Sequence, residues 1–466
     1  MDRFVEPQTV KLGALVLLGL AFAYLWRLNT VMSQTPPPAA EASPYRWADH
    51  EIKETYKRIK AKPIDWVKHL PPKAGRRYVV TGGSGGVGGQ IVLHLLARGE
   101  SPESIRIVDF RKVERADMKA GPAAQVDFAQ ADITSLGATQ AAFDKPWPAT
   151  VAKLPLTVFH TAAFISPGER TLWTYDHIKR VNIDGTQNVV DAAKKAGATI
   201  FIATSSASIS HRPASYWGNP FRRWPRDYFQ LIDESDFDRP IRPRNQYFGN
   251  YPITKAIAER IVCHANSDNF RTGAIRPANA IYGSSNGDQV VGLVLRDRGS
   301  ASWMPNIVQN FVHCGHVSLG HLLFEAALLR KEMPKCAGRP FVITDEGAPP
   351  RFDDVYRLCE LISETPVKVR YLPPAVMLVL AHIIEVFAVA SRMPVLKYVV
   401  PRPKGQVNIL QPGVFHAGLN LIATDKAAQR SVESGGLGLQ HVHNTIQGMC
   451  QQVFDWNNEQ AASQAS

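Results

Sequence analysis

Short apolar runs alternate with longer segments of helical periodicity from residue 76 onward. Four of the apolar runs are predicted to form buried strands, namely 78–81, 105–109, 157–160 and 200–204. Two segments between them carry apolar positions at helical spacing, 90–98 and 182–195. This alternation is typical of a parallel sheet covered by helices. We therefore expect an α/β fold, a Rossmann-type doubly wound parallel sheet, with a smaller mixed C-terminal domain.

A longer apolar run lies near the N-terminus, at residues 12–26 (LGALVLLGLAFAYLW), between Lys11 and Arg27. It is shorter than the ~20 residues of a comfortable membrane span. The aromatic and basic residues at its end are typical of an interfacial anchor. A cleaved signal peptide is the alternative, but no Ala-x-Ala-like site follows directly. Basic residues flank the run on both sides, so the orientation of the predicted anchor helix stays open.

Two further stretches have a distinctive composition. Residues 35–43 (TPPPAAEAS) are predicted to be a Pro/Ala linker that holds the catalytic body off the bilayer. Residues 374–390 form a second apolar stretch, which His382 and Glu385 interrupt. This stretch is either a buried helix of the second domain or a helix lying in the membrane interface.

The net charge of +12 allows three classes of partner: nucleic acid, the anionic face of a membrane, or an acidic substrate. Nucleic acid is the least favoured, because the sequence has no zinc finger and no helix-turn-helix pattern. A general scatter of Lys and Arg over the surface is the alternative to any specific partner. The five cysteines are widely separated and include no Cys-x-x-Cys pair, so neither a disulfide framework nor a metal site is predicted.

A glycine-rich turn follows the first predicted strand and opens a helix near residue 89. Such a turn lets backbone N–H groups approach a pyrophosphate, and the helix N-terminus favours its negative charge. The residues expected to line it are Gly82, Gly83, Gly85, Gly86, Val87 and Gly88. Asp109 ends the next strand, where a carboxylate would bind the adenosine ribose, so NAD is favoured over NADP. Arg111 and Lys112 lie close enough to tolerate a 2′-phosphate.

Tyr251 and Lys255 stand one turn apart on a predicted helix, and therefore on the same face. A free tyrosine has a pKa near ~10 and is a poor base at neutral pH. A nearby ammonium and the positive nicotinamide ring would favour the phenolate. The pair is predicted to handle the proton in the oxidation of an alcohol.

Several segments resemble the extended short-chain dehydrogenase/reductase superfamily. They are the Gly82-x-x-Gly85-x-x-Gly88 spacing, Asp132-Ile133, the His160–Ala163 segment and the Asn182–Thr186 helix start. The resemblance implies that Asp132 and Ile133 contact adenine. It also implies that Ala162 and Ala163 border the cofactor and that backbone near Pro277 holds the nicotinamide carboxamide.

The same resemblance assigns roles to polar residues near Tyr251. Ser206 is identified as the substrate-orienting serine, with Ser205 as the alternative, and Asn182 as a residue that stabilises the site. The intact set of Ser206, Tyr251 and Lys255 argues against a non-enzymatic scaffold.

Within the superfamily the chain resembles the 3β-hydroxysteroid dehydrogenase family, specifically its sterol-4α-carboxylate 3-dehydrogenase (decarboxylating) branch. The segments responsible are 203–208, the helix from Tyr251, 311–321 and 411–420. The resemblance implies NAD-dependent oxidation of a 3β-hydroxyl on a sterol or triterpenoid, with loss of a C4 carboxylate as carbon dioxide. Oxidation without decarboxylation, a dehydrogenase/isomerase, and a nucleotide-sugar epimerase or dehydratase are the alternatives.

The chain departs from the family pattern in two places. Residues 313–316 read His-Cys-Gly-His where the family shows an acidic residue, and residues 211–246 are long and rich in Arg and aromatics. Arg222, Arg223 and Arg226 in the latter either attract a substrate carboxylate or form a solvated basic loop.

The expected organisation has four parts: an anchor segment (1–34), a linker and lead-in (35–75), the NAD-binding domain (76–280) and a substrate-binding part (281–466). The expected partners are an apolar polycyclic alcohol, a membrane and a second copy of the chain, with no nucleic acid. The expected location is the endoplasmic reticulum membrane, with the catalytic domain facing the cytosol.

Overall fold

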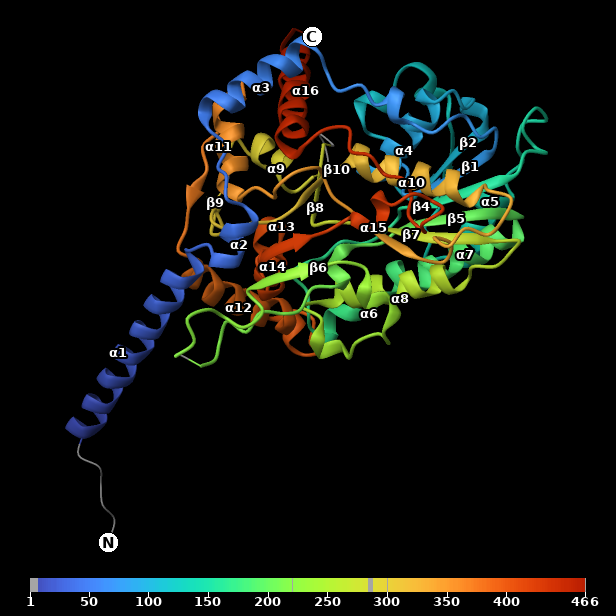
Figure 1. Cartoon of the computed structure of the whole chain (residues 1–466). Coiled ribbons are helices and arrows are strands. Elements are labelled where there is room, and N and C mark those ends of the chain that lie inside the picture. The colour runs from blue at the N-terminus through green and yellow to red at the C-terminus, as the bar shows by residue number, and fades with distance from the viewer. Residues whose placement is uncertain (1–6, 220, 284–287, 300, 466) are drawn as a thin grey trace.

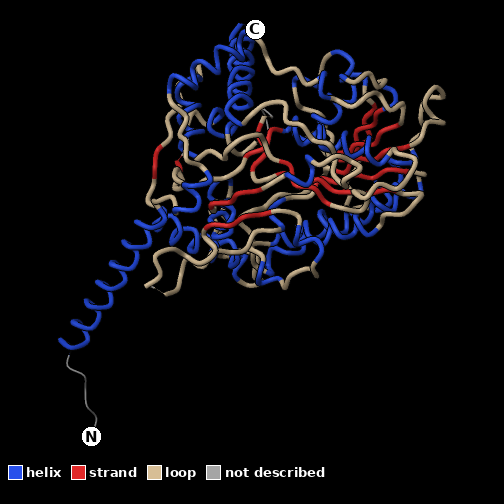
Figure 2. Tube along the Cα trace, in the orientation of Figure 1, coloured by secondary structure: helices blue, strands red, loops and turns tan. Residues whose placement is uncertain are grey.

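A computed structural model describes residues 7–219, 221–283, 288–299 and 301–465. The first six residues of the expected anchor segment lie outside this range. A long helix extends from a body in which strands run between layers of helices (Figures 1 and 2).

Seven parallel strands form the main sheet, in the order β11-β7-β5-β4-β1-β2-β3. Their bounds are β1 (Arg77–Thr81), β2 (Ile105–Asp109), β3 (Asp127–Gln130), β4 (Leu156–His160), β5 (Ala198–Thr204), β7 (Arg271–Pro277) and β11 (Pro340–Ile343). The four strands predicted from apolar runs are all present, and the differences are confined to their first residues. The doubly wound parallel fold is therefore confirmed.

Helices cover both faces of this sheet because its strands are apolar on both sides. On β1, Tyr78 and Val80 face the core beneath α4 (Gly86–Ala97) and α10 (Cys314–Leu328). Val79 between them faces the opposite core, formed with α5 (Leu136–Asp144), α7 (Gly185–Lys195) and α8 (Asn250–His264). The predicted helix near residue 90 begins earlier, inside the glycine turn, and the one at 182 opens with a π-helical turn, Arg180–Asp184.

The strand order reverses between β1 and β4. Strands β2 and β3 extend the sheet on one side of β1, and β4, β5, β7 and β11 extend it on the other. Such a switch point leaves a crevice beyond the carboxyl ends of the two central strands, where ligands of α/β proteins bind. Here Thr81 and His160 are paired at those ends.

The expected boundary at residue 280 does not divide the structure. Strand β11 lies beyond it and forms the edge of the main sheet, and α10 covers one of the sheet's faces. The chain leaves the sheet after β7 and returns to it at β11. The pattern of apolar residues along the sequence cannot reveal this return.

The second core gathers elements from both ends of the chain. Its helices are α3 (Asp49–Ala61), α9 (Val291–Arg296), α11 (Phe352–Ile362), α12 (Pro374–Ala390), α14 (Pro412–Ala417) and α16 (Thr445–Ala465). Three two-stranded parallel sheets accompany them: β8 (Ala280–Tyr282) with β10 (Phe311–His313), β9 (Ala301–Ser302) with β12 (Arg370–Tyr371), and β6 (Phe229–Ile232) with β13 (Asn420–Ala423). The remaining short helices are α6 (Tyr175–Lys179), α13 (Gly405–Ile409) and α15 (Lys426–Gln429).

The segment expected to be a linker is instead folded against the body. Residues Pro37–Ala42 form helix α2, in which Ala39 is fully buried, and Ile52 of α3 is buried in the second core. Pro37 pre-sets the helical φ angle at the first turn, so a Pro/Ala composition suits a short helix as well as a spacer.

Helix α1 (Pro7–Met32) carries the N-terminal apolar run. Within the described residues it is the one helix long and apolar enough to cross a membrane by length and composition. Its side chains from Leu12 to Leu20 are exposed, whereas Leu28 and Met32 at its other end are buried in the second core. The helix therefore passes without interruption from solvent into the folded body, as Figure 1 shows.

The second apolar stretch forms α12, which has two different faces. Leu378, Ala381 and Ala388 are fully buried. The opposite face exposes Val376, Leu380, Ile383, Val386 and Phe387. The helix is thus a core helix on one side and an exposed apolar surface on the other.

Candidate functional site

The glycine turn connects β1 to α4 at the switch point. Gly82 has φ of +73°, a backbone conformation that L side chains rarely adopt. A Cβ atom on Gly82 would lie 2.6 Å from the backbone nitrogen of Ala162, and one on Gly88 would lie 2.4 Å from the carbonyl oxygen of Gly82. Side chains are therefore excluded where the turn meets the segment after β4. The first turn of α4, from Gly86, leaves amide groups without partners inside the helix.

Asp109 ends β2 directly beside this turn. Its Oδ2 accepts a hydrogen bond from the Ser84 amide at 3.1 Å, and its Oδ1 accepts one from the Arg111 amide at 3.1 Å. Two backbone donors thus hold the carboxylate at the carboxyl edge of the sheet. Remaining lone pairs on both oxygens can accept from a ribose diol.

The residues expected around adenine follow β3, the neighbour of β2. The amide of Ala131 donates to the Asp109 carbonyl at 3.0 Å, which places Asp132 and Ile133 immediately after this contact. Asp132 is exposed, and Ile133 is buried against Gly185. Ala162 and Ala163 follow β4, on the other side of the glycine turn. Together these segments border the expected adenosine and pyrophosphate positions.

Tyr251 and Lys255 lie in the first turns of α8. The Lys255 Nζ donates a hydrogen bond to the carbonyl oxygen of Thr204, the last residue of β5, at 2.6 Å. The ends of β1 and β5 are separated by two strand spacings of ~4.8 Å each. This separation suits a dinucleotide that lies across the ends of β1, β4 and β5.

The two candidate serines have different surroundings. The Ser205 Oγ donates to the Glu259 Oε2 at 2.6 Å and is buried. The Ser206 hydroxyl interacts with the Tyr251 phenol instead, and donates to the Ser208 Oγ at 2.8 Å. Ser205 is thus occupied by Glu259, whereas Ser206 is the serine whose hydrogen bond lowers the pKa of Tyr251.

Burial controls the protonation of the tyrosine and the lysine. It raises the pKa of Tyr251 to about 12, and the hydrogen bond with Ser206 opposes that shift. It lowers the pKa of Lys255 to about 8, and the Glu259 carboxylate opposes that shift. The expected lowering of the Tyr251 pKa depends on a bound nicotinamide ring as well as on Lys255, whose ammonium donates to the Thr204 carbonyl.

Glu259 of α8 and Arg276 of β7 form a buried ion pair, which the sequence analysis missed. The Arg276 Nη2 donates to the Glu259 Oε1 at 2.6 Å, and its Nε to the Oε2 at 2.8 Å. Despite burial, the Glu259 carboxylate keeps the pKa of Arg276 above its ordinary value. The pair joins α8 to β7, and Pro277 ends β7 directly after Arg276. Glu259 stands one turn after Lys255, a spacing that could have revealed it.

Asn182 has a positioning role in the structure. Its Oδ1 accepts from the Phe164 amide at 2.8 Å, and its Nδ2 donates to the Thr254 Oγ1 at 3.1 Å. The side chain thus joins the segment after β4 to the catalytic helix. His160 nearby is held between Thr81 and Thr186, and burial lowers its pKa to about 3, so the imidazole is neutral.

The histidine-rich segment 313–316 contributes to a separate buried cluster. The possible ligand atoms of His316, Asp345 and His443 lie within 4.8 Å of one another. Both ring nitrogens of His316 already have partners, the Asp345 Oδ1 at 2.7 Å and the Val442 amide at 3.0 Å. Asp345 also accepts from the amide of His313 at 2.8 Å. An acidic group thus lies against segment 313–316, on Asp345, which follows the end of β11.

The residues present fit NAD. The glycine turn makes a cradle that a Cβ would fill, and the buried Asp109 carboxylate favours two free ribose hydroxyls over a 2′-phosphate. The carboxyl ends of β4 and β5 lie beside that cradle in the sheet order.

Comparisons of sequence place the chain in a family. The sequence profile of the 3-beta hydroxysteroid dehydrogenase/isomerase family matches residues 79–364. The chain is 28% identical to the Mus musculus 3 beta-hydroxysteroid dehydrogenase type 7 over 291 residues, which cover 59% of this chain and 70% of the relative. It is also 28% identical over 316 residues to a Mycobacterium tuberculosis 3 beta-hydroxysteroid dehydrogenase/Delta 5-->4-isomerase, with 64% and 73% covered.

Comparisons of structure agree on the fold. A Stenotrophomonas maltophila UDP-glucose-4-epimerase with bound NAD is similar with a TM-score of 0.55 at 16% identity, covering 84% of this chain and all of the epimerase. MoeE5 in complex with UDP-glucuronic acid and NAD has a TM-score of 0.53 at 18% identity, with 82% and 99% covered. At these identities the likeness concerns the fold alone, whereas the family profile spans more than half of the sequence. The chain belongs to the 3-beta hydroxysteroid dehydrogenase/isomerase family and is an oxidoreductase.

Proposed function

We propose that this protein oxidises the 3β-hydroxyl of a sterol or triterpenoid to a ketone, with NAD as the hydride acceptor. The observation that carries the proposal is the group of Ser206, Tyr251 and Lys255 at the carboxyl end of β5, in a chain of the 3β-hydroxysteroid dehydrogenase family. Ser206 orients the substrate hydroxyl, and Tyr251 takes its proton. Lys255 holds the nicotinamide ribose and favours the phenolate. NAD, when bound, accepts the hydride from the carbinol carbon.

The phenol needs help to act as a base. Burial holds the pKa of Tyr251 near 12 without cofactor. Lys255, whose Nζ donates to the Thr204 carbonyl, would hold the nicotinamide ribose of bound NAD, and its ammonium would then favour the phenolate. We therefore expect Tyr251 to become a competent base only in the cofactor complex.

We further propose that the substrate carries a carboxylate on C4, beside the oxidised carbon. Oxidation then gives a β-keto acid, whose carbon dioxide leaves as the new carbonyl accepts the electron pair. The protein has to supply only the oxidation step. Support comes from the sequence resemblance to the decarboxylating branch.

A membrane location suits such an apolar substrate. We propose that α1 attaches the protein to the endoplasmic reticulum membrane with the catalytic body on the cytosolic side. The exposed apolar side chains of α1 and its burial at Leu28 and Met32 support this arrangement, because the helix ends inside the body.

The test is incubation of the purified full chain with NAD and two matched steroids, one 3β-hydroxy-4-carboxy and one plain 3β-hydroxy. NADH formation with either steroid supports the dehydrogenase. Loss of carbon dioxide in the product mass from the first supports decarboxylation. Failure to form NADH with any 3β-hydroxysteroid, in a protein shown to bind NAD, would reject the proposal.

Two alternatives are separated by the same incubation. A nucleotide-sugar epimerase, the function named for several solved structures of this fold, recycles its cofactor and releases no NADH. A dehydrogenase/isomerase, the activity named for the M. tuberculosis relative, converts a Δ5-3β-hydroxysteroid to a conjugated enone that is detectable by its ultraviolet absorption.

A further inference from the structure

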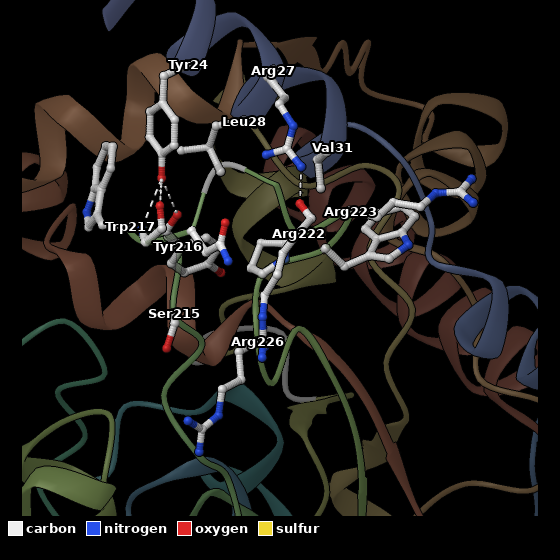
Figure 3. A pocket seen from close by; sticks show the side chains of 14 residues that line it. Tyr24, Arg27, Leu28, Val31, Ser215, Tyr216, Trp217, Arg222, Arg223 and Arg226 are labelled. Carbon is white, nitrogen blue, oxygen red and sulfur yellow. Dashed lines mark hydrogen bonds between the residues drawn. The ribbon is translucent and has the colours of Figure 1, made fainter.

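A basic cavity lies where the apolar helix α1 enters the body. It has a volume of about 300 Å³, is open to solvent on one side, and is bounded by the last turns of α1 and by residues 215–219 and 222–226, called the basic loop below. Figure 3 shows the side chains that line it. Four of the lining residues are arginines, Arg27, Arg222, Arg223 and Arg226, and none of the residues that line it is acidic.

The positive charge of this cavity is mostly uncompensated. Of the four arginines, only Arg226 has an ion pair within the described part of the chain, to Asp227 with Nε and Oδ2 3.3 Å apart. Arg27 donates to the carbonyl oxygen of Arg222, which draws the loop toward the helix. Guanidinium groups without carboxylate partners are suited to bidentate binding of a phosphate. The cavity therefore favours an anion.

Aromatic contacts fix the loop between α1 and α12. The ring of Tyr24 on α1 stacks with that of Trp217 at 6.4 Å between centroids. The Trp217 Nε1 donates to the His382 Nε2 of α12 at 3.3 Å. The Asn29 side chain of α1 accepts from the Ala375 amide of α12 at 3.2 Å. The apolar helix, the basic loop and α12 are thus held in one fixed arrangement.

This arrangement sets the height of the arginines relative to a bilayer. The run from Leu12 to Trp26 rises ~22 Å at ~1.5 Å per residue, so with α1 inserted the Trp26 and Arg27 side chains reach the interface. Helix α12 lies beside the end of α1 that enters the body (Figure 1), and its exposed side chains include Val386 and Phe387. In that orientation the apolar groups would face the acyl chains and the arginines would face the headgroups.

We propose that the cavity binds the phosphate of an anionic phospholipid in the leaflet against which the body rests. The proposal depends on the membrane attachment proposed above and adds its lipid specificity. The arginines of the loop join Arg27 on the body side of α1, and such a cluster favours the anionic cytoplasmic leaflet. None of the residues proposed for catalysis lines the cavity, which argues against a substrate carboxylate as its occupant.

The experiment uses flotation of the full chain with vesicles of phosphatidylcholine alone or of phosphatidylcholine with phosphatidylserine. The wild type is expected to partition about tenfold or more in favour of the anionic vesicles, since each basic side chain near the surface contributes ~1 kcal/mol. The variant Arg222→Gln/Arg223→Gln/Arg226→Gln should lose most of that preference while still binding neutral vesicles through α1.

The matched control is Lys119→Gln/Lys153→Gln/Lys331→Gln, which removes the same charge from exposed positions outside the cavity. This control should retain the preference for anionic vesicles. If both variants lose that preference equally, the cavity is not the site that binds the phospholipid. If the wild type binds both kinds of vesicle equally, the cavity does not recognise an anionic headgroup, although α1 still attaches the protein to the membrane. No binding to either vesicle rejects the attachment itself.

The substrate is tested separately, in detergent. The arginine variant should have an unchanged KM for both the 3β-hydroxy-4-carboxy steroid and the plain 3β-hydroxysteroid. A KM that rises for the carboxylated steroid alone, with the vesicle preference intact, would assign the arginines to the substrate carboxylate instead.

Discussion

The Lys255 ammonium and the Thr204 carbonyl are joined by a hydrogen bond of 2.6 Å. This contact joins the catalytic helix α8 to the end of β5 and holds the lysine at the carboxyl edge of the sheet. Because the carbonyl is a neutral partner, the charge of the buried lysine is not balanced by it. The lysine is therefore held in position, but burying its charge costs free energy. Such a condition is typical of a functional site.

The pH dependence of stability should report this cost. Burial lowers the pKa of Lys255 from 10.5 to about 8 in the folded chain. Between these values the unfolded chain binds a proton that the folded chain does not, so the free energy of unfolding should increase with pH across that window. At ~1.4 kcal/mol per pH unit the increase is about 3 kcal/mol. Denaturant unfolding of the cofactor-free protein from pH 8 to 10 measures it, and Lys255→Met should lack this increase. Parallel curves for the two proteins would contradict the assignment.

Tyr251→Phe should reduce turnover by about 10²–10⁴-fold, because the proton acceptor is removed. The substitution deletes one hydroxyl from a buried ring and should leave the fold and the affinity for NAD unchanged. Steady-state NADH formation measures turnover, and calorimetric titration with NAD serves as the control. Turnover close to that of the wild type in a folded variant would remove Tyr251 from the mechanism.

Ser206→Ala and Ser205→Ala form a matched pair at adjacent positions. Ser206→Ala should lower kcat with little effect on stability, since its hydroxyl lies at the Tyr251 phenol. Ser205→Ala should instead destabilise the protein by about 1–3 kcal/mol, because the buried Glu259 carboxylate loses a donor. Comparing kcat and the urea midpoint for both variants separates the roles, and a reversed pattern would make Ser205 the substrate-orienting serine.

Glu259→Gln should destabilise the folded chain by about 3 kcal/mol, because the buried Arg276 guanidinium loses its fully buried carboxylate partner and keeps only the more exposed Asp236. The control is Glu433→Gln, which breaks the exposed pair with Arg330 and should leave the free energy of unfolding nearly unchanged. Chemical unfolding of both variants provides the comparison. Equal losses of unfolding free energy in the two variants would show that the Glu259–Arg276 pair stabilises the fold no more than an exposed ion pair does.

Asp109→Asn should weaken the preference for NAD over NADP by about tenfold or more, since a carboxylate both accepts from ribose hydroxyls and repels a 2′-phosphate. The amide keeps the shape of the side chain beside the Ser84 and Arg111 amides. The ratio of kcat/KM for the two cofactors is the measurement. Asp191→Asn, at an exposed position on α7, is the control and should leave the ratio unchanged.

The sequence predicted the elements whose residues are neighbours in the chain. The strands at 78–81 and 105–109, the glycine turn and the Tyr251–Lys255 spacing all follow from local periodicity, because the helix and strand repeats determine which side chains share a face. The family resemblance assigned these local patterns to an oxidoreductase, and the family profile confirmed that membership.

Contacts between distant segments could be decided only by the tertiary structure. The return of the chain to the main sheet at β11, the ion pair of Glu259 with Arg276, and the carboxylate that Asp345 supplies to segment 313–316 each join residues that no local period relates. The same holds for Arg27 and Arg222, which are far apart in the chain and line one cavity. Periodicity determines which face of an element is apolar, whereas the packing of those faces determines which polar groups meet.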